Sequence, residues 1–289
     1  MAFSLASSAI LVSLRLTQPK RKKKLAIASN LVREHFGCSR QSGDFEAKLY
    51  PAEFERPQLK VYEDAFALHK RLTCRWEHGL DIITKKGKPR LDDEHRNAIA
   101  LFDDAVQKQG ARYDTEILPA ARRELGQVLF DKVEYPTAEE WVDQWTLRSV
   151  TRPVPNTGDL RLTLPTDQIA DIENELREQH RAGLKDVFGR LETLVRASAT
   201  ALTQYGVKPR AKLYQQTVQD HLSELVSAVD GLNIPDEDGN RDVGLEGIAT
   251  EITNVILTPE FDDLKEDKEL RQSVGKKASA LADKLRGYA

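Results

Sequence analysis

The chain has 289 residues, of which 40% are hydrophobic and 31% are charged, and its net charge is -3. This near balance excludes a polycation that binds nucleic acid through its overall charge, and no apolar run reaches the roughly 20 residues that a membrane-spanning helix needs. The two cysteines, Cys38 and Cys74, are too few for a disulfide scaffold. We therefore expect a reducing compartment, the cytoplasm, and no membrane association.

The first 57 residues predict one strand, one helix and a long loop. In "AILVSLRL", apolar residues from Ile10 to Leu16 alternate with the others, which is typical of a half-buried strand. Five consecutive basic residues follow at 20–24, and we expect them to form an exposed connection out of this strand. Residues 25–36 have a helical pattern, whereas residues 37–57 contain scattered Gly, Ser and Pro, as loops do.

The middle of the chain predicts helices interrupted by a turn. Apolar residues three or four apart predict a helix from Pro57 to Trp76, and residues 79–93 predict a turn or short hairpin. A long helix then extends to Ile117, and Pro119 should kink or end it because its ring removes a backbone donor.

A helix start and a pair of strands are expected next. Thr137 and Glu140 have the spacing of a capping box, in which each side chain binds the other residue's backbone N–H. The segment "TLRSVTRPVPNTGDLRLTLP" (146–165) predicts two strands joined by "PVPNTG", and these could pair with the first strand in a small antiparallel sheet.

From residue 166 onward the chain predicts only helices. Apolar stripes at helical spacing extend over about 166–204, 218–232, 245–255 and 274–285, the second with near-heptad spacing. We therefore expect a mainly α chain with a small antiparallel β-sheet (α+β) and a coiled-coil-like C-terminal helical part. Stripes of this length form either an internal core or a surface that binds a partner.

The sequence suggests two parts with different charge. Residues 1–165 hold 27 Lys+Arg and 23 Asp+Glu, whereas residues 166–289 hold 16 and 23. We expect an α+β N-terminal part, 1–165, and a helical C-terminal part, 166–289, which could also form a single domain. Their opposite net charge would favour self-association.

The basic run is the candidate nucleic-acid-binding site. Phosphates bind clustered Lys and Arg, and aromatic residues stack on bases where the target is single-stranded. The run contains no aromatic residue, and a solvated loop at a strand end is the alternative interpretation. The residues concerned are Lys20, Arg21, Lys22, Lys23 and Lys24.

A second candidate is a tetrahedral zinc site. His35 and Cys38 are three residues apart, and Cys74 and His78 are four apart, so together they supply the ligand types of structural zinc. The alternative is that the cysteines are small buried hydrophobic residues. No phosphate-binding Gly-Lys-Ser/Thr loop, Gly-x-Ser-x-Gly elbow or His-Glu-x-x-His motif is present, so we expect neither an enzyme nor a bound cofactor.

Four segments of the chain carry a resemblance: "SLASSAILVSLRL", "LHKRLTCRWEHGLDII", "FDKVEYPTAEEW", and "PVPNTGDLRLTLP" followed by "DVFGRLETLV". In this order, over residues 4–232, the chain resembles an uncharacterised helical accessory-protein family of tailed phages and proteobacteria. The acidic insert after Pro235 departs from that pattern. The resemblance implies a bacteriophage accessory factor of unknown function, encoded near MoxR-type AAA+ ATPases and von Willebrand factor A-domain proteins, and it brings no catalytic residues.

Together these observations favour a non-enzymatic viral accessory protein that acts by protein–protein interaction or self-assembly. It would be a scaffold or an adaptor, for example one for an AAA+ ATPase, in the cytoplasm of a host bacterium. We expect a homo-oligomer or a protein partner. The alternative is a recombination or replication accessory that binds nucleic acid through residues 20–24.

Overall fold

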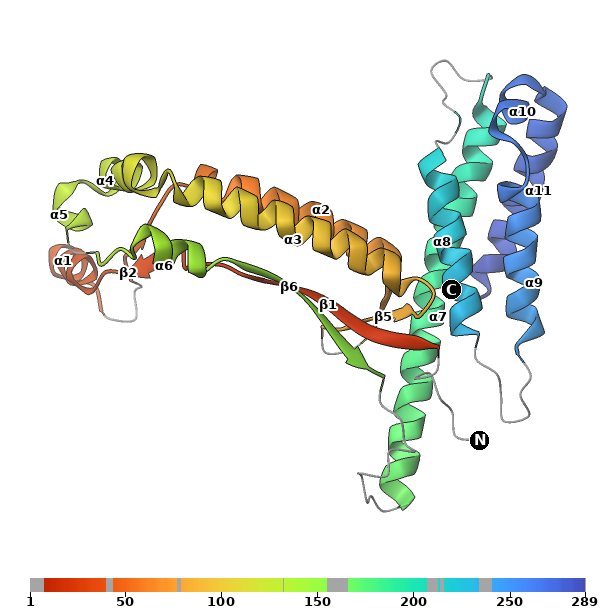
Figure 1. Cartoon of the computed structure of the whole chain (residues 1–289), viewed down its shortest axis with the longest axis horizontal. Helices are drawn as coiled ribbons and strands as arrows, with labels where there is room; N and C mark the ends of the chain where they lie inside the picture. The colour runs from red at the N-terminus through yellow and green to blue at the C-terminus, as the bar shows by residue number, and fades with distance from the viewer. Residues whose placement is uncertain are drawn as a thin grey trace. The chain divides into compact units, whose positions relative to one another are not determined.

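The computed structural model describes residues 8–39, 44–76, 79–131, 133–154, 166–206, 213, 216–233 and 241–288 (Figure 1). It is mainly helical (69%) with a four-stranded antiparallel sheet and a two-stranded sheet, which confirms the α+β class. The strands are β1 (Ala9–Thr17), β2 (Lys22–Lys24), β3 (Glu46–Lys48), β4 (Cys74–Arg75), β5 (Asp81–Thr84) and β6 (Thr146–Pro153). The helices are α1 (Ala26–Phe36), α2 (Arg56–Leu72), α3 (Lys88–Gly110), α4 (Leu118–Leu125), α5 (Gln127–Phe130), α6 (Ala138–Asp143), α7 (Thr166–Gln204), α8 (Gln216–Leu232), α9 (Val243–Ile252), α10 (Phe261–Glu266) and α11 (Lys268–Arg286).

The chain divides into two compact units that alternate along the sequence. The helical-bundle unit comprises residues 1–13, 68–92 and 150–289, and the aromatic-core unit comprises 14–67 and 93–149. Neither unit coincides with the expected parts, residues 1–165 and 166–289. The expected division therefore stays a prediction about which parts fold independently. The aromatic-core unit holds 18 Lys+Arg and 19 Asp+Glu, which leaves 25 and 27 for the bundle unit. Each unit is therefore nearly neutral.

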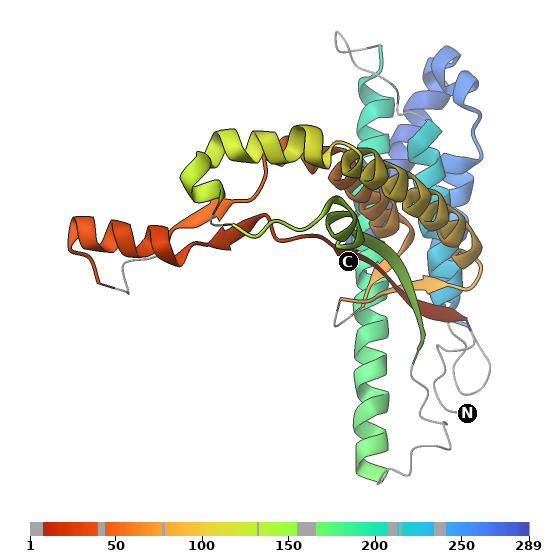
Figure 2. The ribbon, with the colours of Figure 1, turned by 60° about the vertical axis from the view of Figure 1, so that its left-hand side comes forward.

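In the helical-bundle unit, α7, α8, α9 and α11 lie side by side (Figures 1 and 2). The apolar stripes predicted for these helices face one another and form a shared core. Members buried in that core include Leu176, Val187, Leu191, Val195, Leu202, Leu222, Leu225, Val229, Leu232, Ile248, Ile252, Ala278, Leu281 and Leu285. Burial of this much apolar surface supplies the main driving force for folding of the bundle.

The four-stranded sheet has the strand order β4-β5-β1-β6, of which β4, β5 and residues 9–13 of β1 belong to the helical-bundle unit. β1 pairs antiparallel with β5, with Ala9 opposite Thr84 and Val12 opposite Asp81. Both faces of β1 are covered, because Leu11 joins the bundle core and Val12 packs in a separate cluster with Ile83. The expectation of a half-buried strand was therefore wrong for residues 11–14, because the side chains on both faces of the strand are apolar or small and are buried.

The aromatic-core unit is organised around Trp141, which is fully buried. Its ring centroid lies 5.6 Å from that of Tyr113 and 5.7 Å from that of Trp145. The predicted capping box starts α6: Thr137 Oγ1 accepts from Glu140 N at 3.2 Å, and Glu140 Oε2 accepts from Thr137 N at 2.8 Å. This local prediction is confirmed.

Two segments differ from the sequence-based expectations. The basic run does not form a connection: its last three residues are strand β2, paired antiparallel with β3, so that Lys22 lies opposite Lys48 and Lys24 opposite Glu46. Residues 79–93 contain the expected turn, at 85–87, but it joins β5 to the start of α3 and not two strands of a hairpin. The second strand expected within 146–165, at residues 160–164, lies outside the described residues.

Candidate functional site

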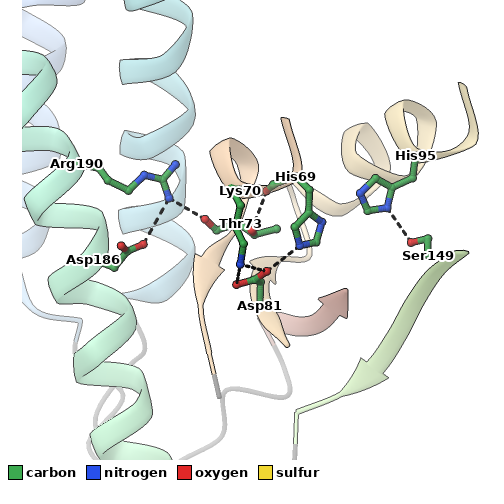
Figure 3. A network of polar contacts seen from close by, with 8 residues as sticks. All are labelled: His69, Lys70, Thr73, Asp81, His95, Ser149, Asp186 and Arg190. Carbon is green, nitrogen blue, oxygen red and sulfur yellow. Dashed lines mark hydrogen bonds and ion pairs between the residues drawn. The ribbon is translucent and has the colours of Figure 1, made fainter. Parts of the chain in front are cut away.

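A buried polar network surrounds Asp81 at the start of β5 (Figure 3). His69 is fully buried and its Nε2 lies 2.8 Å from Asp81 Oδ2. Lys70 Nζ donates to both carboxylate oxygens, at 2.7 and 2.6 Å. Thr73 Oγ1 donates to the backbone oxygen of His69 at 2.7 Å within the end of α2, and the bonds from His69 and Lys70 to Asp81 hold this helix end against β5.

The hydrogen bonds of this network determine the charge state of Asp81. Burial acts to raise the pKa of its carboxyl, but the hydrogen bonds from His69 and Lys70 outweigh it and lower the pKa below the usual value. The buried group therefore stays an anion at neutral pH, balanced by Lys70.

Arg190 on α7 completes the end of α2. Its Nη1 donates to the backbone oxygen of Thr73 at 2.7 Å, its Nη2 donates to that of Arg71, and its Nη1 lies 3.5 Å from Asp186 (Figure 3). The last carbonyls of a helix have no partner within the helix and carry partial negative charge, so a guanidinium there acts as a cap. The role of Arg190 is therefore structural.

The same geometry argues against catalysis by the His69–Asp81 pair. A general base must reach the substrate proton within hydrogen-bond distance, and the imidazole of His69 has no exposed surface and already binds a carboxylate. Figure 3 also shows a second histidine bond, between His95 Nδ1 and Ser149 Oγ at 2.8 Å in the aromatic-core unit, and this histidine is likewise buried.

The predicted basic site is spread along β2 and largely paired with acids. The four nearest contacts are Arg21 to Glu55 at 3.6 Å, Lys22 to Glu46 at 3.5 Å, Lys23 to Glu134 at 3.8 Å and Lys24 to Asp44 at 2.9 Å. Lys20 is exposed. The hydrogen bond and charge of Asp44 raise the pKa of Lys24. The run is thus a charged edge whose positive potential is reduced by neighbouring carboxylates.

The structure places the four predicted zinc ligands in different surroundings. His35 and Cys38 are exposed at the end of α1, whereas Cys74 is buried in the bundle core, where burial raises the pKa of its thiol to about 12. His78 lies outside the described residues. Among the residues that are described, no three His, Cys, Asp or Glu side chains form a group that could hold a metal ion.

An exposed apolar surface on α1 was missed by the sequence reasoning. Ile27, Leu31 and Phe36 are 54%, 59% and 69% exposed, and Val32 is also exposed. We call these four residues the α1 apolar surface. Ile27 and Leu31 share one face of the helix, and Val32 and Phe36 share another. The helix is attached through Ser29, whose Oγ accepts from the backbone N–H of Phe45 at 2.9 Å. The sequence did contain a signal for this surface. "AIASNLVREHF" has apolar residues on more than one face of the helix, and a helix that packs on one side only cannot bury all of them.

Comparisons with known proteins give no match: no family model, no curated protein and no solved structure is significantly similar to this chain. Among the helices that the structure describes, none combines the length and hydropathy needed to cross a bilayer. The resemblance to a phage accessory family therefore stays a prediction, and the functional argument rests on the geometry above.

Proposed function

We propose that this protein is a non-enzymatic, phage-type accessory protein that acts by protein–protein interaction or self-assembly in the host cytoplasm, through the α1 apolar surface. The observation that carries the proposal is the contrast between helices. The stripes of α7, α8 and α11 are buried within the chain, whereas α1 leaves four large apolar side chains in solvent on eleven residues. Large apolar side chains that a folded chain gathers on one exposed element are typical of interaction sites.

Charged residues on and before α1 suit a specific protein contact. Lys24 and Arg33 both bind Asp44, and Arg33 follows Val32 in the helix. Interfaces commonly combine an apolar centre with a polar rim, and the rim contributes more to specificity than to affinity. A scaffold or an adaptor, including one for an AAA+ ATPase, would use such a surface.

Light scattering coupled to size-exclusion chromatography tests the proposal. The double variant Ile27→Ser/Leu31→Ser should shift the wild-type oligomer toward monomer, or abolish binding of a protein captured by the wild type. Its matched control is Val128→Ser on α5, because Val128 is 76% exposed in the same unit but not part of the α1 apolar surface. A wild type that is monomeric at all concentrations and binds no protein through α1 would contradict the proposal.

The alternative, nucleic-acid binding through residues 20–24, keeps some support because Lys22, Lys23 and Lys24 remain exposed. Phosphates could compete with the long contacts to Glu46 and Glu134. Binding would then weaken steeply with salt, and replacing all five basic residues by Ser would abolish it. Unchanged binding by that variant would exclude the run.

A further inference from the structure

The α1 apolar surface lies within a stretch of the chain that carries excess positive charge. Residues 20–39 and 44–48, which contain β2, α1 and β3, hold seven Lys+Arg and three Asp+Glu. Two further carboxylates pair with Arg21 and Lys23, and counting them still leaves two positive charges in excess. A partner that covers α1 therefore meets a basic rim beside the apolar side chains.

Exposed bases of this rim lie on one face of the two-stranded sheet. Lys22 lies opposite Lys48, and Lys24 is two residues from Lys22, so the three side chains share a face. All three are exposed, and no ion pair between described residues includes Lys48. Lys24 and Arg33 of α1 bind the same carboxylate, that of Asp44, so this face adjoins the helix.

The helical-bundle unit carries an acidic stretch at residues 258–269, around α10, and we call it the α10 acidic segment. It holds six acids and two bases. All six acids are exposed, and the ion pair that described residues form there joins Asp262 to Lys265 at 2.9 Å. The buried Arg271 donates to the backbone oxygens of Leu264 and Lys265, and counting its charge still leaves three negative charges in excess. The acids are Glu260, Asp262, Asp263, Glu266, Asp267 and Glu269.

An apolar side chain lies among these acids. Phe261 packs in part against the bundle core and is partly exposed, and the exposed Glu260 and Asp262 precede and follow it. The segment thus combines an apolar centre with an acidic rim, whereas α1 combines an apolar centre with a basic rim. Complementary charges steer two surfaces together and select the partner, and contact between the apolar side chains excludes water.

We propose that α1 of one copy of this chain binds the α10 acidic segment of a second copy. This inference rests on the proposed function, since it identifies the partner of the α1 apolar surface. A nucleic acid would pair with the basic rim but leave Ile27 and Leu31 in water, whereas the acidic segment offers both carboxylates and Phe261. Two different surfaces make a head-to-tail contact, which continues from copy to copy into a ring or an open chain.

An exchange of charges tests this contact, measured by light scattering after size-exclusion chromatography. Two variants reverse three charges each, one in the rim, without the residues that bind Asp44, and one in the segment. They are Lys20→Glu/Lys22→Glu/Lys48→Glu and Glu260→Lys/Asp263→Lys/Glu266→Lys. Each variant alone should self-associate about tenfold or more weakly than the wild type, because like charges then face each other. An equimolar mixture of the two should recover the association, since every rim then finds a segment of opposite charge.

A matched control reverses three exposed acids on α7 of the same unit, outside the segment. It is Asp171→Lys/Glu175→Lys/Glu178→Lys, and it should associate as the wild type. Thermal melting checks that every variant folds. The wild type gives a second measurement: its association should weaken about tenfold between about 50 and 500 mM salt, because salt screens exposed charges.

Three results would overturn the contact. One is loss of association in both variants without recovery in the mixture, and another is wild-type association that salt does not weaken. If Ile27→Ser/Leu31→Ser dissociates the oligomer while both charge variants associate normally, the proposed function stands and this inference fails. A wild type that is monomeric at all concentrations also overturns it, even where α1 captures another protein.

Discussion

Replacing Asp81 by asparagine removes one charge from the buried network and nearly preserves its shape. The bond from His69 is fully buried, and a hydrogen bond to a charged group contributes about 1.5 to 3 kcal/mol. The bond from Lys70 is worth less, at most about 1 kcal/mol, because that side chain is 47% exposed. Asn can still accept a neutral hydrogen bond from His69, so we expect the free energy of unfolding to fall by about 2 to 3 kcal/mol.

Urea unfolding followed by circular dichroism measures this change, with Asp104→Asn as the matched control. Asp104 binds Lys108 at 2.6 Å in an exposed pair on α3, so its replacement should change the free energy of unfolding by less than about 0.5 kcal/mol. Equal effects of the two substitutions would refute the reasoning, because they would show that burial of the Asp81 bonds adds nothing.

The same network predicts a dependence of stability on pH. The pKa of Asp81 is lowered in the folded chain, so its stabilisation is complete above its unfolded pKa, about 3.9, and is lost as the pH falls through the folded value. The difference in unfolding free energy between wild type and Asp81→Asn should therefore shrink as the pH falls below about 4. A difference that stays constant down to pH 2 would contradict an ionised Asp81.

Two further predictions concern single positions. At pH 8, the exposed Cys38 should react with a thiol reagent at once. Burial raises the pKa of Cys74 to about 12, so this thiol should react about 10³-fold more slowly than an ordinary one. Mass spectrometry measures both rates, and equal rates would contradict the burial of Cys74. Gly231→Ala should lower the melting temperature, because a Cβ there would lie 2.2 Å from Thr84 Cγ2. Gly247→Ala should raise the melting temperature, because a Cβ there meets nothing within 4 Å and Ala favours helices.

Features set by neighbours in the sequence could be predicted from it. The capping box of Thr137 and Glu140 needs only a three-residue spacing, and the stripes of α7, α8 and α11 need only a helical period. Such patterns depend on local geometry, which each segment imposes by itself.

Features that depend on pairing across the chain could not be predicted. β2 is a strand because residues 22–24 pair with residues 46–48, and the intervening helix gives no sign of that partner. Likewise, no residue near His69 in the sequence indicates that its side chain binds Asp81, because β4 and a turn separate the two residues along the chain. Burial of a charge is decided by the folded surroundings, which a period or a motif does not contain.

The contrast between α1 and the bundle helices shows why the amount of apolar sequence is a poor guide to an interaction surface. The stripes of α7 and α11 are long, yet each covers the other, and no large apolar side chain that the structure describes on these two helices is exposed. α1 is short, but its position beside the two-stranded sheet offers a surface for only part of its apolar residues, and Leu31 and Phe36 stay in water. Leaving such side chains exposed gains nothing for the isolated chain, since burying each would contribute about 1.5 to 3 kcal/mol. Binding of a second surface would recover that free energy, and α1 is therefore where the search for a partner should begin.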